Sequence, residues 1–479
     1  MRPNKWSLLF FILILCDIAY TFSQNYRLVS LDGDLCSIVL PWPGYAFVLH
    51  DPLGLDVLLN GEYYPATNRF FIHFFMYEYF HSFPFFLQNF FAPIESLYYS
   101  MTIFRTMIQV ILLYLVAYYA SGSPRIFNRN FLIAAILVTP LFQIEGYVEQ
   151  IGITLNSITY TFFYALPFVF ILLYFLPFYS AYFHERRIRF NLFIHLLLAA
   201  CLFVIVFGGP LGAPVILLAC SSVLLYAFIT SFRRSNELIA KRFIHSINSI
   251  PKIVLWHFSF AILLALYSTY IGTHNTENLW TEMPLMDRYG LLLKGLWHIL
   301  TFKLGASLLF VATIVNVALV SRFHTPAARR IVLLGKFILI LCIAYILLLP
   351  LGGYREYRPL IIRVDTFAPV SVAAILLFVH SGLFLINNLR LTRRKILIGC
   401  LTAFGLVYTN ADHPGKGSNA CEKATMRQIA NSDEPVVLLR SGCSPLSWGK
   451  ITNPDDSGEK AELLYYWNVT REKKLYYFE

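Results

Sequence analysis

Apolar stretches long enough to cross a lipid bilayer recur along most of this chain, and they limit its fold more than any other feature. A transmembrane helix needs about 20 mostly apolar residues. Only 14% of the residues are charged, whereas about a quarter are charged in a soluble domain. We therefore expect an all-α polytopic membrane protein with about 11 transmembrane helices. The expected spans lie near residues 6–23, 101–120, 131–143 (short, with a re-entrant segment as the alternative), 157–178, 190–207, 213–231, 253–271, 293–320, 331–350, 368–386 and 396–411.

The distribution of charge predicts the topology. A net charge of +11 would suggest a nucleic-acid partner in a soluble protein. Here, however, 20 basic residues fall in alternate connections with only two acids, and the opposite connections hold 14 acids. Basic residues mark the cytoplasmic side of a membrane protein. We expect a cytoplasmic N-terminus, an external C-terminus and no nucleic-acid partner. The basic residues are Arg2, Lys5, Arg125, Arg129, Arg186, Arg187, Arg189, Arg233, Arg234, Lys241, Arg242, Lys252, Arg322, Arg329, Arg330, Lys336, Arg390, Arg393, Arg394 and Lys395.

Four regions follow from the spans and the polar segments: a first transmembrane helix at 1–23, an external loop at 24–100, a helical core at 101–411 and an external tail at 412–479. A cleaved signal peptide is the alternative for the first region. In the tail, a strand-like run at 435–440 predicts a small folded unit. An oxidising envelope would allow Cys421 and Cys443 to close a disulfide loop of about 23 residues.

The first external loop contains the sharpest acidic motif, Asp32-Gly33-Asp34. Two carboxylates on either side of a glycine can share a divalent cation, or divide into a base and an orienting group. The alternative is an ordinary solvated Asp-Gly turn. Because the motif follows the first span closely, both carboxylates should lie near the membrane surface.

The rest of this loop is rich in phenylalanine and proline. The loop, at 24–100, is also much longer than most connections between helices. Such a composition fits short amphipathic helices that lie in the membrane interface. The run from Arg69 to Phe75, which includes His73, is one expected example. Arg69 and His73 are therefore candidates for contact with a substrate. The alternative is a lid that only covers the helices.

Two further groups of charged residues belong to the expected external side. Glu145 and Glu149 are four residues apart, so they share one face if this connection is helical; a solvated loop is the alternative. Arg355, Arg358 and Arg363 lie together on a side where basic residues are scarce. Guanidinium groups suit a phosphate or diphosphate because their paired donors match its oxygens. A loop held by arginine-carboxylate pairs is the alternative.

This arrangement resembles the GT-C superfamily of integral-membrane glycosyltransferases, in which a first span precedes a large external loop that opens with an acidic motif. The segment from Asp32 to Arg105 is similar to loops in bacterial, Bacteroidetes-type members. The resemblance implies a polyprenyl-phosphate-linked sugar donor. It also implies that Asp32 or Asp34 is the base or metal ligand, with Glu145 and Glu149 as the second acidic motif. Arg355, Arg358 and Arg363 would bind the donor phosphate.

The function expected from this resemblance is inverting transfer of a sugar to an envelope glycan or lipid, at the external face of a bacterial inner membrane. Mg²⁺ or Mn²⁺, held by Asp32 and Asp34, would be the cofactor if a metal is used. The glutamate-rich second motif departs from the metal-dependent members and puts the metal in doubt. The alternatives are a lipid-linked glycan polymerase or ligase, and a transporter or flippase that is not an enzyme.

Overall fold

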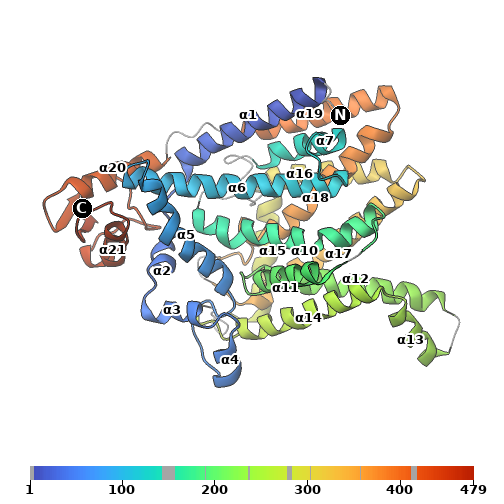
Figure 1. The fold of residues 1–479 in the computed structure, drawn as a ribbon, viewed down its shortest axis with the longest axis horizontal. Helices are drawn as coiled ribbons and strands as arrows, with labels where there is room; N and C mark the ends of the chain where they lie inside the picture. Colours follow the sequence, from blue (N-terminus) through green and yellow to red (C-terminus); the bar gives the residue numbers. More distant parts are fainter. Residues whose placement is uncertain are drawn as a thin grey trace.

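The computed structural model describes residues 5–142, 157–188, 190–235, 238–277, 283–302, 304–355, 358–411 and 418–479. Within these ranges it is a bundle of long helices that run beside one another along the longest axis of the molecule (Figure 1). In the part of the chain that the structure describes, seven helical segments are long and apolar enough to cross a membrane. The protein is therefore a multi-pass, all-α membrane protein. The seven are Lys5–Leu28, Pro93–Ser121, Ile158–Phe183, Gly212–Arg234, Lys252–Gly272, Pro326–Gly352 and Val364–Asn388.

Helix starts agree with local capping chemistry. Asn128, Asn191 and Thr325 accept backbone N–H groups at the starts of three helices, which replaces hydrogen bonds that a first turn lacks. In order, the helices of the bundle are α1 (Lys5–Leu28), α6 (Pro93–Ser121), α7 (Arg129–Val138) with η1 (Thr139–Phe142), α9 (Ile158–Tyr160) with η2 (Thr161–Ala165) and α10 (Leu166–Phe183), α11 (Leu192–Val206), α12 (Gly212–Arg234), α13 (Ile239–Asn248), α14 (Lys252–Gly272), α15 (Leu285–Phe302), α16 (Leu304–Val320), α17 (Pro326–Leu348) with η3 (Leu349–Gly352), α18 (Val364–Asn388) and α19 (Leu391–Ala411).

The span expected at 293–320 is bent in the structure, and the expected total of eleven is not established. The stretch 293–320 contains two helices, α15 and α16, which meet at a bend of 82°. Hydropathy reports composition and not direction, so two apolar helices in series read as one. Counting this pair as one span gives up to eight. Two other expected spans correspond to shorter apolar helices, Arg129–Phe142 and Leu192–Val206.

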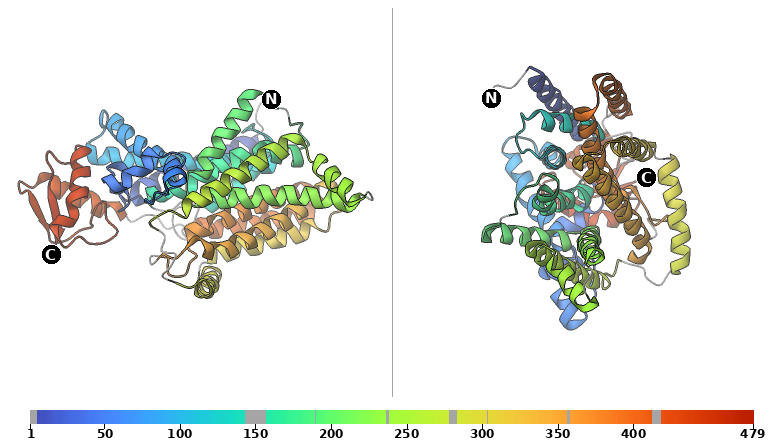
Figure 2. Two further views of the ribbon diagram at one scale, coloured as in Figure 1. Left: turned by 90° about the horizontal axis from the view of Figure 1, so that it is seen from below. Right: turned by 90° about the vertical axis from the view of Figure 1, so that its right-hand side faces the viewer.

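Figure 2 shows the long helices packed beside one another in two further views. Three of these segments are mostly buried and form the centre of the bundle. The central segments α6, α9–α10 and α18 have 72%, 72% and 78% of their most apolar stretch buried in the protein, against 11% for α12 and for α17. The apolar side chains of the outer helices are therefore exposed on the surface of the bundle, where lipid would contact them. Polar side chains that belong to the central helices are consequently shielded from both water and lipid, and the site described below begins at their ends.

The bundle has two different ends. Among the described residues, the loop end comprises 29–92, 207–211, 273–277, 283–284, 349–355 and 358–363. The basic end comprises 122–128, 184–188, 190–191, 235, 238–251, 321–325 and 389–390. At the loop end, the first long connection folds into four helices. Among them α5 buries Ile72, Met76 and Phe80. The four are α2 (Leu35–Val39), α3 (Pro43–His50), α4 (Leu55–Asn60) and α5 (Phe70–Gln88).

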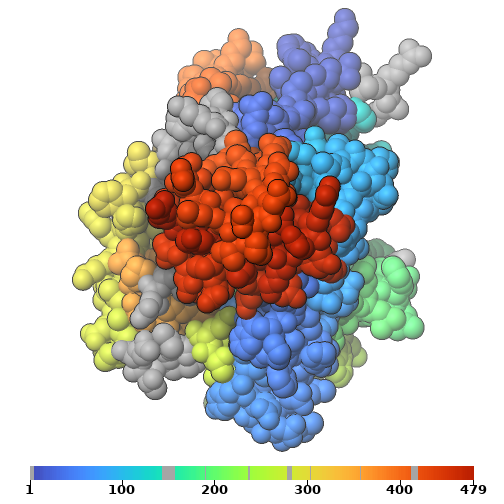
Figure 3. Space-filling view, turned by 90° about the vertical axis from the view of Figure 1, so that its left-hand side faces the viewer, coloured from blue at the N-terminus to red at the C-terminus, as the bar shows by residue number. Residues whose placement is uncertain are grey.

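Residues 418–479, called the C-terminal domain below, cover the middle of the loop end (Figure 3). The domain contains α20 (Ser418–Asn431), β1 (Val436–Leu439), η4 (Pro454–Ser457), α21 (Gly458–Tyr466) and β2 (Leu475–Phe478). The two strands pair in parallel, with Val436 opposite Leu475. A disulfide joins Cys421 to Cys443.

The C-terminal domain is fastened to the first loop by a buried side chain. Trp467 is fully buried and packs against Phe80 of α5, with ring centroids 5.8 Å apart. Its indole N–H donates to the carbonyl of Phe80 at 3.1 Å, and Gln88 donates to the carbonyl of Trp467 at 2.8 Å. These contacts make the domain and the loop one packed unit, which allows residues from both to share a site.

Candidate functional site

Asp32 lies directly after α1 and is almost completely buried, with 2% of its surface exposed. Ser157 Oγ and Thr159 N donate to Oδ2, and Thr159 Oγ1 and the backbone N–H of Asp34 donate to Oδ1. The backbone also pairs Ser30 with Ser157. Burial, together with nearby Asp34, raises the pKa of Asp32 to about 6, although its hydroxyl donors act in the opposite direction. Asp32 therefore fixes the acidic motif to the start of α9.

Asp34, two residues later, lies closer to the surface and faces other charges. The indole N–H of Trp448 donates to its Oδ1 at 3.0 Å. Burial raises the pKa of Asp34, and Glu277 adds to this, while Trp448, Arg363 and Arg69 lower it. Asp34 is thus the carboxylate of the motif that lies within electrostatic reach of arginines.

Glu277, from the connection after α14, accepts two arginines. Arg69 Nη1 lies 3.2 Å and Arg355 Nη2 lies 3.4 Å from its Oε2. Burial alone would raise the pKa of Glu277, but Arg69 and Arg355 outweigh it and hold the pKa below its usual value. Glu277 therefore joins the first loop to the connection before α18.

Asp365, in the first turn of α18, accepts the other two arginines. It is 1% exposed, bonds to Arg363, and lies 3.6 Å from Arg358 Nη2. The same arginines reach two tyrosines: Arg358 donates to the hydroxyl of Tyr164 at 2.7 Å and Arg363 to that of Tyr160 at 3.2 Å. Tyr164 belongs to a π-helical turn and Tyr160 precedes it. Such turns are frequent at functional sites.

We call these seven residues the charged cluster: Asp34, Arg69, Glu277, Arg355, Arg358, Arg363 and Asp365. Six of them form two triads in which one carboxylate is shared by two arginines. Asp34 interacts electrostatically with both triads, with Arg69 and Glu277 of one and with Arg363 of the other. With Asp34 ionised, four arginines and three carboxylates carry a sum of +1.

His73 supports this arrangement. It is buried, its Nδ1 lies 2.8 Å from the carbonyl of Arg69, and its Nε2 lies 3.3 Å from the hydroxyl of Tyr45. Tyr45 in turn lies 3.3 Å from Glu277 Oε1. Burial lowers the pKa of His73 to about 4. A neutral imidazole in this position braces Arg69 and does not add positive charge.

The structure brings together most of the residues that the sequence singled out. Asp32, Asp34, Arg69 and His73 from the first loop lie around the same cluster as Arg355, Arg358 and Arg363, from a connection almost 300 residues later. Glu145 and Glu149 lie outside the described residues, so their role stays a prediction. Sequence reasoning missed four participants, which are Tyr160, Tyr164, Glu277 and Trp448. Glu277 had one usable signal, its position just after an expected span on the acidic side.

The described residues do not fit a bound metal at the acidic motif. Among them, no group of three or more histidine, cysteine, aspartate or glutamate side chains is placed to hold an ion. Both oxygens of Asp32 already accept hydrogen bonds from hydroxyl and backbone donors, whereas Mg²⁺ requires oxygen ligands that face it. Asp34 receives an indole N–H, which cannot ligate a cation. We therefore assign neither carboxylate as a metal ligand.

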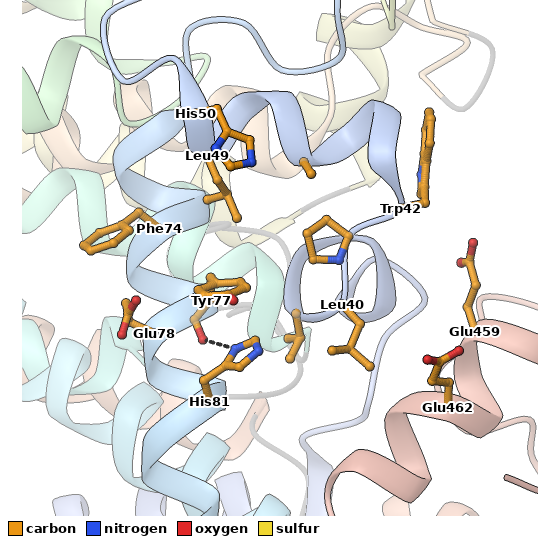
Figure 4. A pocket seen from close by; sticks show the side chains of 13 residues that line it. Leu40, Trp42, Leu49, His50, Phe74, Tyr77, Glu78, His81, Glu459 and Glu462 are labelled. Atoms are coloured by element: carbon orange, nitrogen blue, oxygen red, sulfur yellow. Dashed lines mark hydrogen bonds between the residues drawn. The ribbon is translucent and has the colours of Figure 1, made fainter.

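A groove of about 680 Å³ opens on the outer side of α2 and α3. Figure 4 shows Glu459 and Glu462 of the C-terminal domain across from Tyr77 and His81 of α5. Leu40 lies between these two pairs, and Trp42 lies on the side of Glu459. The lining contains none of the residues of the charged cluster, so the groove and the cluster are separate features of the loop end.

Comparisons of this chain with protein-family models, with curated proteins and with solved structures find no match.

Proposed function

We propose that this protein is a membrane-embedded glycosyltransferase that takes a sugar from a polyprenyl-phosphate donor and passes it to an envelope glycan or lipid. In this proposal the loop end faces the outside of a bacterial inner membrane. The observation that carries the proposal is the charged cluster: four arginines share two carboxylates beside a further carboxylate, Asp34, at the ends of membrane-spanning helices.

The arginines suit the phosphate of such a donor. Each guanidinium has five N–H donors in a planar fork, which matches the oxygens of a phosphate. Their side chains are partly exposed, from 12% for Arg355 to 29% for Arg363, so the arginines lie near the surface of the loop end. A lipid tail would remain among the apolar side chains of the outer helices while its phosphate reaches the cluster.

The chemistry assigned to the cluster is a single displacement. Asp34 takes the proton of the acceptor hydroxyl as its oxygen attacks the anomeric carbon of the donor sugar. The bond from that carbon to the phosphate oxygen breaks, and its electron pair leaves with the phosphate. Attack from the side opposite the leaving group inverts the anomeric configuration.

The charge of the cluster changes in step with this reaction. A phosphodiester donor carries one negative charge and meets a cluster of +1. Once Asp34 has accepted the proton, the cluster carries +2, and the departing phosphomonoester approaches −2 at neutral pH. Fixed positive groups that match charge as it develops stabilise a transition state. Asp32 serves in this scheme as a positioning group, because its oxygens are occupied and buried.

The first experiment tests sugar transfer. The purified full-length protein in nanodiscs is incubated with a panel of polyprenyl-phosphate hexoses and pentoses, and release of free polyprenyl phosphate is measured with and without envelope glycan. We expect Asp34→Asn to lower the rate by about 10² to 10⁴, the range of general base catalysis. Asp433→Asn, at an exposed position of the C-terminal domain, is the matched control. Full activity of Asp34→Asn would remove the catalytic assignment.

The second experiment tests phosphate recognition without knowledge of the sugar. Binding of farnesyl phosphate is compared with binding of farnesol, which has the same apolar chain and no phosphate. We expect farnesyl phosphate to bind more tightly than farnesol. Arg355→Gln should weaken binding of farnesyl phosphate by about 10-fold or more, since charged hydrogen bonds contribute about 1.5–3 kcal/mol. Arg329→Gln, at an exposed position of the basic end, should leave it unchanged. Equal binding of both probes would contradict the proposal.

Transport of a lipid-linked glycan is a second candidate, because α6 has polar side chains buried within the bundle. Thr102, Arg105 and Gln109 are all less than 5% exposed, and buried polar groups within spans commonly mark transport paths. Proteoliposomes containing a fluorescent polyprenyl-phosphate lipid distinguish the two: movement between leaflets without bond cleavage would favour transport.

A further inference from the structure

The side chain of Trp448 crosses from the C-terminal domain to the acidic motif. More than half of its surface, 59%, is exposed, yet its indole N–H donates to Asp34 Oδ1 at 3.0 Å. The two residues are 414 positions apart in the chain. An exposed tryptophan that directs its only polar atom to a candidate base is not explained by burial of apolar surface.

Gly33 leaves the space that this contact requires. A Cβ atom at position 33 would lie 2.6 Å from Cδ1 of Trp448 and 3.0 Å from its backbone nitrogen. The indole therefore rests directly on the backbone of the acidic motif. This close approach gives a physical reason for the glycine between the two aspartates, in addition to any turn preference.

The segment that carries Trp448 is held in a defined conformation. Leu446 is fully buried, its N–H donates to the carbonyl of Leu31 at 3.1 Å, and its φ is +58°. A residue other than glycine adopts a positive φ only at an energetic cost, so surrounding contacts must hold Leu446 in this conformation. The disulfide at Cys443 joins the start of the same segment to α20.

Trp448 also contacts the arginine side of the cluster. Its ring stacks on that of Tyr160, with centroids 5.8 Å apart and planes 28° apart. The hydroxyl of Tyr160 accepts a hydrogen bond from Arg363 at 3.2 Å. One side chain thus links the carboxylate to the groups that would bind phosphate.

We propose that Trp448 is a positioning residue of the site, which orients the Asp34 carboxylate through its indole N–H and makes the C-terminal domain an essential part of the catalytic centre. This inference rests on the proposed function for the role of Asp34. The contact between Trp448 and Asp34 is independent of that role, and it can be measured separately.

Loss of the indole N–H has a defined effect on Asp34. The charged or titratable groups that face Asp34 are Asp32 on its own segment, Tyr45 of α3, Arg69 at the start of α5, Tyr160 of α9, Glu277 after α14 and Arg363 at the start of α18. Trp448 lowers the pKa of Asp34. Without this bond the carboxylate needs a higher pH to ionise, so the acid limb of the rate profile moves to higher pH.

The activity test compares Trp448→Phe, which keeps an aromatic ring and loses the N–H, with the control Trp256→Phe at a 75% exposed position of α14. We expect Trp448→Phe to move the acid limb of kcat to higher pH, because a hydrogen bond that favours the ionised carboxylate is lost. Gly33→Ala should lower kcat because the indole must shift. An unchanged pH profile and kcat in Trp448→Phe would overturn the proposal.

A second measurement does not depend on activity. The protein has seven tryptophans, so 5-fluorotryptophan labelling gives a small set of ¹⁹F resonances, and the one missing in Trp448→Phe belongs to Trp448. We expect this resonance to titrate with pH in the unsubstituted protein and to lose that titration in Asp34→Asn. Titration that persists in Asp34→Asn would overturn the contact. Loss of titration without any detectable sugar transfer would support the contact and contradict the proposed function alone.

Discussion

The charged side chains of the site at the loop end are buried or partly buried and shared, whereas those at the basic end are mostly exposed. Asp32 and Asp365 are 2% and 1% exposed, and each of the two triads ties one carboxylate to two arginines. At the basic end most arginines and lysines are exposed, and Arg330 pairs with Glu185, whose side chain is 72% exposed. Solvated basic residues determine the orientation of a membrane protein through the excess of Lys and Arg on one side of the membrane. Buried, mutually dependent charges indicate a site.

The largest effect should come from separating the C-terminal domain from the loop end. Trp467→Ala removes a fully buried indole and should cost about 4 kcal/mol of stability, as for large aromatic side chains in other cores. Thermal unfolding and limited proteolysis of the protein in detergent would measure it. Tyr465→Ala, at a half-exposed position two residues earlier, is the control, and a similar loss in both variants would mean that Trp467 does not anchor the domain.

Burial of Asp32 predicts a pH dependence that belongs to the loop end. Because its pKa is raised to about 6 in the folded protein, the folded state binds the proton more tightly than the unfolded chain. The resulting stabilisation is present below about pH 4 and is lost as the pH rises through 6, a change of about 3 kcal/mol. The difference in thermal stability between the unsubstituted protein and Asp32→Asn, followed from pH 4 to 8, isolates this contribution. A difference that does not vary with pH would contradict it.

The smallest effects test the comparison of the two ends directly. Arg363→Ala leaves the buried Asp365 with Arg358 as its remaining arginine, so we expect a loss of about 2 kcal/mol, below the 3–5 typical of a broken buried pair. Arg330→Ala at the basic end should cost less than about 1 kcal/mol, because exposed pairs contribute little. Equal losses in the two variants, measured by unfolding in detergent, would show that the two ends do not differ in this way.

Much of the loop end could be predicted from the sequence because its arginines are rare there. Scarce basic residues on an acidic side identified Arg355, Arg358 and Arg363, and the Asp-Gly-Asp triplet identified Asp32 and Asp34. Their convergence could not be predicted, since hydropathy places helices along the chain but gives no packing between them. The bend between α15 and α16 was missed for the same reason.

Site residues that are brought together only by tertiary structure could not be predicted from the sequence either. Glu277 is an ordinary acid of a short connection until the fold places Arg69 and Arg355 beside it. Trp448 lies in a polar tail with no motif around it, and only the docking of the C-terminal domain brings its indole to Asp34. Single residues with long-range partners carry no periodic signal, so pattern reasoning does not detect them.

The contact between Gly33 and Trp448 also sets an order of events during synthesis. The acidic motif leaves the ribosome more than 400 residues before the segment that completes it. Every span between the two must be inserted before the indole can reach the glycine. A chain made only as far as the last span therefore lacks the assembled centre, which forms when a small disulfide-braced domain docks.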